Sequence, residues 1–227
     1  MQITLVNLRI AGKLKYYIDM KLTKLQHACF YIEHDGKRLL VDPGNFTADL
    51  DAKLKLDYVV ITHEHPDHLD YGNLKRIASI NPEVKIITHP STKFNNPEGL
   101  DHQTVLPGDD IAVGPFNLRF FGGEHAPIHP DVPHVANLAI LINETVYYPG
   151  DSMTRPGIDV KYLALPISAP WLKISETIDL LRDINPTSAF PTHDAILSNE
   201  GKSLIDGLVG RLAGDINYQR INGSIEI

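Results

Sequence analysis

Seven residues, Thr62-His63-Glu64-His65-Pro66-Asp67-His68, limit what this chain can be more than any other part of its sequence. They end a continuous apolar run, Asp57–Thr62, of the kind found in strands that are buried on both faces. Three histidines and one aspartate in an H-x-H-x-D-H pattern are rare by chance. Alternate residues of an extended segment point to the same side, so His63 and His65 can bind one metal ion through neutral imidazole nitrogens.

The second half of this motif points elsewhere. Asp67 and His68 are adjacent in sequence and face away from the first pair, toward a second metal position. Neither half-site is complete, because a metal ion in a protein needs three or more ligands. The alternative interpretation is a solvated polar loop that caps the following helix, with Asp67 or Asp70 as the N-cap residue.

Three further polar residues follow other strand-like runs, in the segments Gly122-Gly123-Glu124-His125, Pro149-Gly150-Asp151-Ser152 and Pro191-Thr192-His193-Asp194. Taken singly, His125 is typical of a loop histidine, Asp151 of a turn residue and His193 of a polar helix start. Their shared position at the ends of strands indicates that they complete the ligand set.

The rest of the chain alternates short strands with amphipathic helices. We expect an antiparallel meander over Ile3–Ile10, Leu14–Leu22, Ala28–Glu33 and Arg38–Val41, and helices over Leu69–Ile80, Ile174–Ile184 and about Glu200–Leu212. A strand-rich region, Gln103–Tyr148, is interrupted by a loop over Gly122–His134. This order predicts an α/β fold of the four-layer αββα type, with two mixed sheets face to face and the helices outside. We expect one domain over residues 1–227.

The length and the net charge of the chain indicate which role a metal site has and which partners to expect. A chain of 227 residues can bury a large core without a structural metal, so a metal site here is expected to be functional. With 21 basic against 28 acidic residues, the net charge of −7 offers no general attraction to nucleic acid or to anionic lipid. We therefore expect a small-molecule substrate and neither nucleic acid nor membrane as partner. A homo-oligomer is compatible with this composition.

The cysteine content and the apolar runs suggest the compartment. Cys29 is the one cysteine, cannot form an intramolecular disulfide, and is expected to be a small core residue. No run reaches the 18 apolar residues of a membrane span, and Met1–Gly12 lacks the apolar region of a signal peptide. These features favour a cytoplasmic location.

The ordered ligand residues resemble those of the metallo-β-lactamase superfamily, whose dinuclear hydrolases carry H-x-H-x-D-H and then a His, an Asp and a last His on successive strand-end loops. The match runs from about Lys24 to Ile196. The resemblance implies that Asp151 bridges the metals, with the other ligands divided between a first ion (His63, His65, His125) and a second ion (Asp67, His68, His193).

Within that superfamily, Leu25-Gln26-His27-Ala28 and Val41-Asp42-Pro43 are similar to the branch of ascorbate-6-phosphate lactonase-like and uncharacterised metal-dependent hydrolases. Residues 1–23 exceed the usual start of this branch, and we expect them to form an added N-terminal hairpin. True β-lactamases of this fold have Cys where Asp151 stands, so antibiotic hydrolysis is not expected. Flavodiiron proteins have Glu in place of His65 and a flavin domain that 227 residues cannot hold.

Two divalent ions that share a carboxylate and a water would produce a bridging hydroxide able to attack a carbonyl or phosphoryl centre. Asp67 could serve both as ligand and as proton acceptor. Ligation by nitrogen and oxygen alone suits zinc or manganese, and iron is compatible. We expect hydrolysis of a small anionic ester or lactone. A phosphodiesterase on the same site, or a non-hydrolytic metal-binding redox or sensor protein, are the alternatives.

Four other residues are candidates for the pocket. By resemblance, His27 faces the metals and is a candidate catalytic residue. Arg155 could hold an anionic group by paired hydrogen bonds, Trp171 could form a pocket wall, and His129 could line the cleft.

Asp42 and Asp70 have two interpretations of equal weight. Each could fix the tautomer of a ligand imidazole, or each could be a local structural residue in a turn or at a helix cap.

Overall fold

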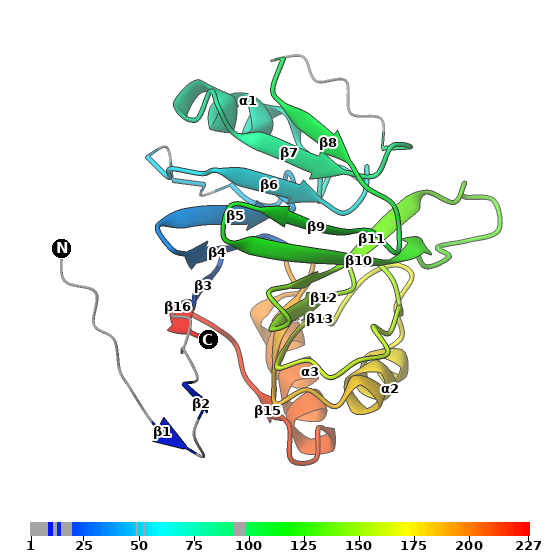
Figure 1. The fold of residues 1–227 in the computed structure, drawn as a ribbon. Coiled ribbons are helices and arrows are strands. Elements are labelled where there is room, and N and C mark those ends of the chain that lie inside the picture. The colour runs from blue at the N-terminus through cyan, green and yellow to red at the C-terminus, as the bar shows by residue number, and fades with distance from the viewer. Residues whose placement is uncertain (1–8, 11–12, 15–19, 49, 52, 93–98) are drawn as a thin grey trace.

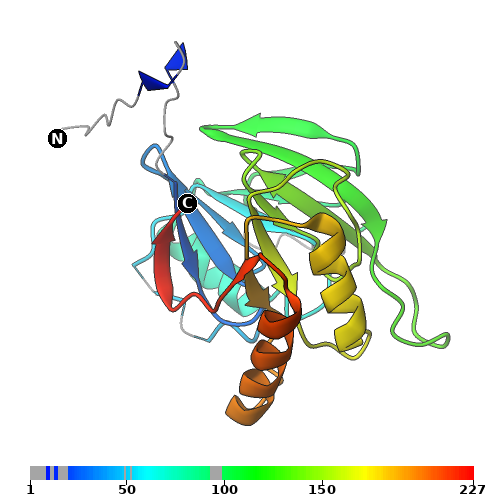
Figure 2. The same cartoon turned by 90° about the horizontal axis from the view of Figure 1, so that it is seen from below.

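Two mixed sheets of seven strands each lie face to face in the computed structural model, which describes residues 9–10, 13–14, 20–48, 50–51, 53–92 and 99–227. Helix α1 (Tyr71–Ile80) covers the outer face of one sheet, and α2 (Ile174–Ile184) and α3 (Asn199–Leu212) cover the outer face of the other (Figures 1 and 2). The αββα arrangement expected from the sequence is confirmed. Among the described residues, no helix combines the length and the apolar character needed to cross a bilayer.

The two sheets repeat one pairing scheme. The first has the order β16 (Gly223–Glu226), β3 (Met20–Lys24), β4 (Phe30–His34), β5 (Lys37–Val41), β6 (Tyr58–Ile61), β7 (Lys85–Thr88) and β8 (His102–Thr104). The second has the order β9 (Asp110–Val113), β10 (Phe116–Glu124), β11 (Ala136–Ile142), β12 (Val146–Tyr148), β13 (Tyr162–Pro166), β14 (Ser188–Thr192) and β15 (Asn217–Tyr218). In each, the first pairings are antiparallel and those from the fourth strand onward are parallel.

The N-terminal hairpin predicted over residues 1–23 lies largely outside the described residues. Two short strands of it are described, β1 (Arg9–Ile10) and β2 (Lys13–Leu14), and they pair antiparallel. Met20–Lys24, which closes this segment, is a full member of the first sheet and pairs with both β4 and β16.

Three apolar layers separate the four layers of secondary structure. Aromatic side chains such as Phe30, Phe116 and Tyr148 fill the space between the sheets, and other clusters lie under α1 and under α2 and α3. Each buried side chain of this size contributes roughly 1.5–3 kcal/mol, and we expect a core of this extent to fold without a metal. Cys29 is a free, fully buried thiol, and burial raises its pKa to about 12, in keeping with its predicted role as a core residue.

Strand direction gathers the polar segments at one edge. Strands β3, β5 and β6 run the same way in the first sheet, as do β10, β12, β13 and β14 in the second. Two backbone hydrogen bonds join the sheets at this edge, from Leu138 N–H to Thr62 O and from His193 N–H to His27 O. Segments that follow these strands therefore meet, as ligand-binding segments do at the carboxyl ends of open α/β sheets.

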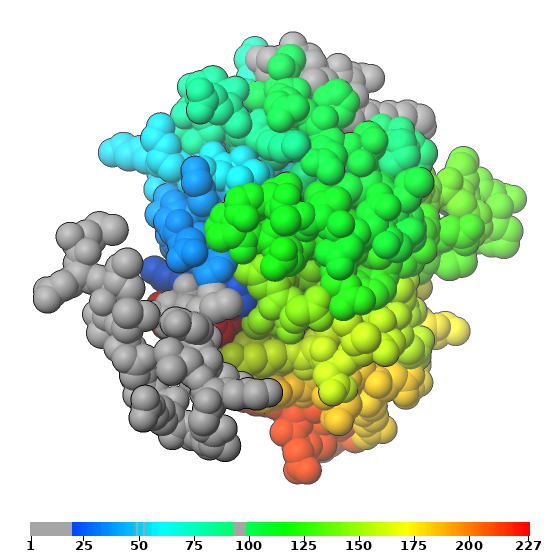
Figure 3. Space-filling view, in the orientation of Figure 1, coloured from blue at the N-terminus to red at the C-terminus, as the bar shows by residue number. Residues whose placement is uncertain are grey.

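The loop between β10 and β11 projects from the body of the molecule (Figures 1 and 3). β10 extends to Glu124, whereas the sequence predicted a loop from Gly122 onward. The strand continues because Gly122, Gly123 and Glu124 pair with β11. The two glycines allow the φ angles of 83° and 138° found there, which residues with a Cβ rarely take.

Candidate metal centre

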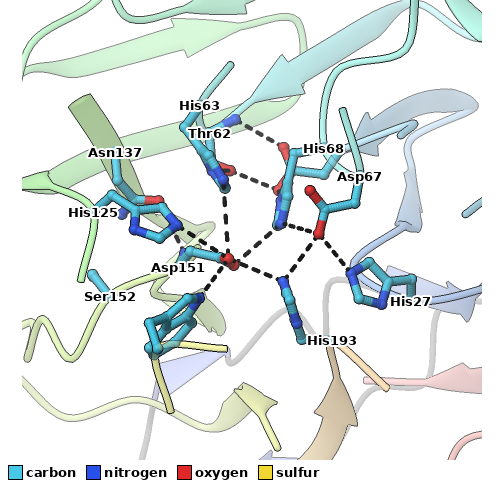
Figure 4. A network of polar contacts seen from close by, with 12 residues as sticks. His27, Thr62, His63, Asp67, His68, His125, Asn137, Asp151, Ser152 and His193 are labelled. Atoms are coloured by element: carbon cyan, nitrogen blue, oxygen red, sulfur yellow. Dashed lines mark hydrogen bonds and ion pairs between the residues drawn. The ribbon is translucent and has the colours of Figure 1, made fainter. Parts of the chain in front are cut away.

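Four buried histidines converge on one carboxylate, that of Asp151 (Figure 4). Its Oδ2 lies 2.9 Å from Nε2 of His193, 3.3 Å from Nε2 of His125 and 4.0 Å from Nε2 of His63. Its Oδ1 lies 3.2 Å from Nε2 of His68. These residues follow β6, β10, β12 and β14, as the strand-end argument from the sequence expects.

In each of these imidazoles the other nitrogen has an oxygen partner. Nδ1 of His125 lies 2.6 Å from Ala126 O, and Nδ1 of His193 lies 2.6 Å from Ser168 O. Because a carbonyl oxygen only accepts, the proton of each neutral ring is on Nδ1 and the lone pair is on Nε2. This is the tautomer that a metal ligand requires.

The same holds for the two histidines that follow β6. Nδ1 of His68 donates to Asp42 Oδ2 at 2.7 Å. Thr62 donates its own hydroxyl proton to Asp42, so its oxygen is free to accept from Nδ1 of His63 at 3.0 Å. The Nε2 atoms of all four rings are buried without a hydrogen-bond partner. Unpartnered buried nitrogens are costly in a folded protein, which makes this donor set fit a metal ion.

The ligand atoms fall into three groups, and the atoms of each lie within 4.8 Å of one another. One group consists of His63, His65 and His125, and another consists of His27, Asp67, His68 and His193. Asp151 joins them, since it groups with His63 and His68. The structure thus brings together all the ligand residues that the sequence singled out, and His65 is the least buried of the histidines among them.

The surroundings of the cluster shift the pKa values of its histidines in two directions. Burial alone would lower the pKa of His68, but Asp151 and Asp42 outweigh it and hold that pKa well above its usual value. Burial likewise opposes the charge on His193, and Asp151 raises the pKa of His193 to about 9. Burial lowers the pKa of His63 and His65, which stay neutral. A divalent ion would displace the protons from His68 and His193.

The backbone around the H-x-H-x-D-H loop is shaped by residues 42–44. Asp42 is fully buried, has a φ of 47°, and accepts from both the amide and the hydroxyl of Thr62. A Cβ on Gly44 would lie 1.8 Å from the carbonyl oxygen of Asp67, so only glycine allows this close approach. Asp42 thus has the tautomer-fixing role, whereas Asp70 is the N-cap of α1 and accepts from Asn73 N–H at 2.8 Å.

The loop that carries Asp151 is held by a residue that the sequence analysis missed. Asn137, fully buried in β11, accepts from Asp151 N–H at 3.0 Å and donates to Pro149 O at 2.9 Å. Its oxygen lies so close to Gly150 that a Cβ there would be 2.3 Å away. The only signal in the sequence is one amide within the apolar run Ala136–Ile142.

His27 lies beside the second ligand group. It is buried, has a φ of 54°, and its Nε2 lies 3.0 Å from Asp67 Oδ2. The Ala195 amide donates to Nδ1 of His27 at 3.2 Å, so the ring proton is on Nε2 and points to Asp67. Burial lowers the pKa of His27, which keeps the ring neutral.

The turn that presents His27 is held by the partly buried Lys24. Lys24 Nζ donates to the carbonyls of Leu25, His27 and Cys29 at 2.8, 2.6 and 3.2 Å. Burial lowers the pKa of Lys24 to about 8, although Asp194 acts in the opposite direction, so its ammonium is charged at neutral pH.

Trp171 lies closer to the centre than a pocket wall would require. Its Nε1–H donates to Asp151 Oδ2 at 2.9 Å, and its ring contacts those of His125 and His193. The indole therefore orients the carboxylate on which the histidines converge.

The structure does not bring the other two substrate candidates to this cluster. Arg155 is half-exposed and binds Asp183 of α2 through Nε and Nη2. His129 lies on the projecting loop, 62% exposed, with Asp131 as its neighbour. The sequence could not predict the ion pair between Arg155 and Asp183, because Asp183 lies 28 positions further along the chain, in α2.

A family model described as the beta-lactamase superfamily domain matches residues 21–193. Protein Rv0786c of Mycobacterium tuberculosis is 35% identical over 193 residues, which span 83% of this chain and 90% of that protein. The UPF0173 metal-dependent hydrolase SSP1060 of Staphylococcus saprophyticus is 29% identical over 202 residues, covering 77% of this chain and 85% of the relative.

Solved structures agree on the fold. Igni18, described as a novel metallo hydrolase from the archaeon Ignicoccus hospitalis, superposes with a TM-score of 0.72 at 20% identity. The superposition covers 92% of this chain and 97% of Igni18. At this level of identity the likeness supports the shared architecture alone.

Proposed function

The chain belongs to the metallo-β-lactamase superfamily, and on that premise we propose that it is a metal-dependent hydrolase that uses two divalent ions on a small anionic ester or lactone. The Staphylococcus relative is named a metal-dependent hydrolase, which agrees with this activity. The number of ions and the substrate class are our proposals.

One observation carries the proposal: four buried imidazoles direct unpartnered Nε2 atoms at Asp151, while an oxygen fixes each Nδ1. Four imidazoles with Nδ1 fixed in this way can all direct Nε2 lone pairs at a cation beside Asp151. His63, His65 and His125 would hold one ion and Asp67, His68 and His193 the other, with Asp151 between them. Nitrogen and oxygen donors without a thiolate favour zinc or manganese. Bound divalent ions would supply a water of lowered pKa and would stabilise negative charge on the attacked group.

Asp67 and His27 are the residues of this chain that would position the reacting water. Burial would raise the pKa of Asp67, but His193 and His27, whose Nε2 atoms face its Oδ2 at 3.3 and 3.0 Å, outweigh burial and hold that pKa well below the usual range. Asp67 is therefore a carboxylate at neutral pH, and its side chain is 21% exposed at the mouth of the centre. Its Oδ2 can accept a hydrogen bond from a water beside it and so orient that water, while His27 Nε2–H keeps the carboxylate oriented.

The test is metal analysis followed by a substrate panel. Purified protein loaded with zinc or manganese should hold two ions per chain, and His193→Ala should lose at least one. The loaded protein should hydrolyse small carboxylic esters or lactones with a higher kcat/KM than bis-aryl phosphodiesters.

Three outcomes would contradict the proposal. A single ion at saturation would exclude the dinuclear arrangement. Faster cleavage of the phosphodiesters than of any ester or lactone would favour a phosphodiesterase on the same residues, and a colour due to iron with no hydrolysis would favour a redox or sensor protein.

A further inference from the structure

A cavity of about 520 Å³ borders the candidate metal centre at His27. It lies between the turn after β3 and the start of α3, and its lining includes Lys24, His27, Phe46, Asp194, Lys202 and Arg220. We name it the Lys202 cavity. His27 belongs to both places, since its Nε2 faces Asp67 of the metal centre while its ring forms part of the cavity wall.

The charge of this cavity differs from that of the whole chain. Three cations line it, and the carboxylates that neutralise them are Asp194, in the lining, and Asp206, which binds Arg220. One positive charge is left over in a chain whose net charge is −7. Excess cations in a partly enclosed cavity attract an anion in spite of the overall charge.

The three cations are not equally available to a ligand. Lys24 Nζ already donates to three carbonyls, so it acts as a fixed charge. Arg220 is held by Asp206 through Nε and Nη2 and by Asp194 through Nη1. Lys202 Nζ lies 3.3 Å from Asp194 Oδ2, and its side chain is 30% exposed. An ammonium has three donors, so Lys202 can present N–H groups to the cavity beyond the one that faces Asp194.

Apolar lining beside these donors defines the rest of the ligand. The ring of Phe46 packs edge-on against His27 at 4.9 Å between centroids, yet Phe46 is 43% exposed. A partly exposed aromatic side chain beside a cavity suits an organic molecule and not a free inorganic ion alone.

We propose that the Lys202 cavity is the subsite for the anionic end of the substrate, with Lys202 as its direct ligand and Arg220 as the fixed cation behind it. The inference rests on the proposed function, and it moves the role predicted for Arg155 to Lys202. The group bound must accept hydrogen bonds, since ammonium and guanidinium groups only donate, and a carboxylate or a phosphate meets this need. The substrate's ester or lactone then extends past His27 toward Asp67.

The test uses a matched pair of chromogenic esters on the metal-loaded protein: mono-4-nitrophenyl adipate and its methyl ester. Both release 4-nitrophenolate, and they differ only in the remote carboxylate. We expect wild type to prefer the acid, and Lys202→Ala to lower the acid-to-methyl-ester ratio of kcat/KM about fivefold. Lys202→Arg should keep most of the preference. Lys75→Ala, which removes an exposed lysine on α1, is the control for net charge and should behave as wild type.

A binding experiment distinguishes a failure of this inference from a failure of the proposed function. Adipate and, in a second titration, inorganic phosphate are added to wild type and to Lys202→Ala and followed by calorimetry. Lys202-dependent binding without ester hydrolysis would uphold the subsite and contradict the hydrolase proposal. An unchanged ratio and unchanged binding in Lys202→Ala would overturn the subsite and leave the hydrolase proposal standing. The tighter of the two probes identifies carboxylate or phosphate as the preferred group.

Discussion

Replacing Asp42 by Asn should weaken metal binding at His68 without touching a ligand. Asp42 Oδ2 accepts from His68 Nδ1–H and from the Thr62 hydroxyl, both at 2.7 Å, and Oδ1 accepts from the Thr62 amide at 2.8 Å. An asparagine offers one oxygen, which the amide of Thr62 retains. Its NH₂ group then faces His68, whose Nδ1 must become an acceptor. The proton moves to Nε2, the atom that faces Asp151 at 3.2 Å.

The expected loss follows from this change of tautomer. Removing the partner that orients a metal-bound histidine costs about 10- to 100-fold in metal affinity, or roughly 1.4–2.8 kcal/mol. The loss of one charge-assisted hydrogen bond in the buried network should also lower the free energy of unfolding by about 1–3 kcal/mol. Competition with a chromophoric chelator measures the affinity for zinc, and thermal unfolding confirms that the variant is folded.

Asp70→Asn is the matched control. It makes the same chemical change a few residues from the motif, but asparagine caps a helix as well as aspartate does, so α1 should be unaffected. A folded Asp42→Asn protein that binds zinc within threefold of wild type would refute the reasoning, as would an equal loss in Asp70→Asn.

Three other predictions concern the same cluster. Trp171→Phe should reduce zinc affinity about three- to tenfold, because it removes the hydrogen bond to Asp151. The tryptophan fluorescence of wild type, which reports this one side chain, should change on metal loading. No change in either measurement would contradict the positioning role of Trp171. Asp67→Ala should abolish hydrolysis while circular dichroism stays that of wild type, and chelated wild type should also remain folded; cooperative unfolding on chelation at room temperature would make the metals structural. Zinc added to metal-free protein at pH 7 should release protons, because the raised pKa values of His68 and His193 leave them charged before binding; a calorimetric heat independent of buffer ionisation would contradict this.

The order of elements was predictable from local patterns. The amphipathic run Ile174–Ile184 coincides with α2, and the apolar run Asp57–Thr62 contains β6. Helical periodicity and buried-strand composition are local properties, so they can be recognised in the sequence before the partner sheet is known. The strand-end rule then placed His125 and His193 near the H-x-H-x-D-H loop.

The two C-terminal edge strands were not predictable in this way. β15 and β16 are short, polar and mostly exposed, and their residues show no apolar alternation. β16 pairs with β3 across almost the whole chain, with Gly223 opposite Lys24. Such pairing depends on the assembled sheet, because an edge strand with little burial has little local signal.

Contacts between side chains distant in sequence account for the remaining differences at the site. The sequence left Asp42 and Asp70 as equal candidates, and only the packing of Asp42 against Thr62 and His68 distinguishes them. Asn137 carried no motif at all. Polar residues that support a ligand loop from a neighbouring strand are visible only once the register of that strand is known.

Anomalous diffraction from crystals of the zinc-loaded protein, recorded above the zinc absorption edge, tests the dinuclear centre most directly. We expect two peaks about 3.5–4 Å apart. One should lie against Nε2 of His63 and His125 and the other against Nε2 of His68 and His193, with the Asp151 carboxylate between them. A single peak at full loading, or peaks away from these nitrogens, would contradict the account.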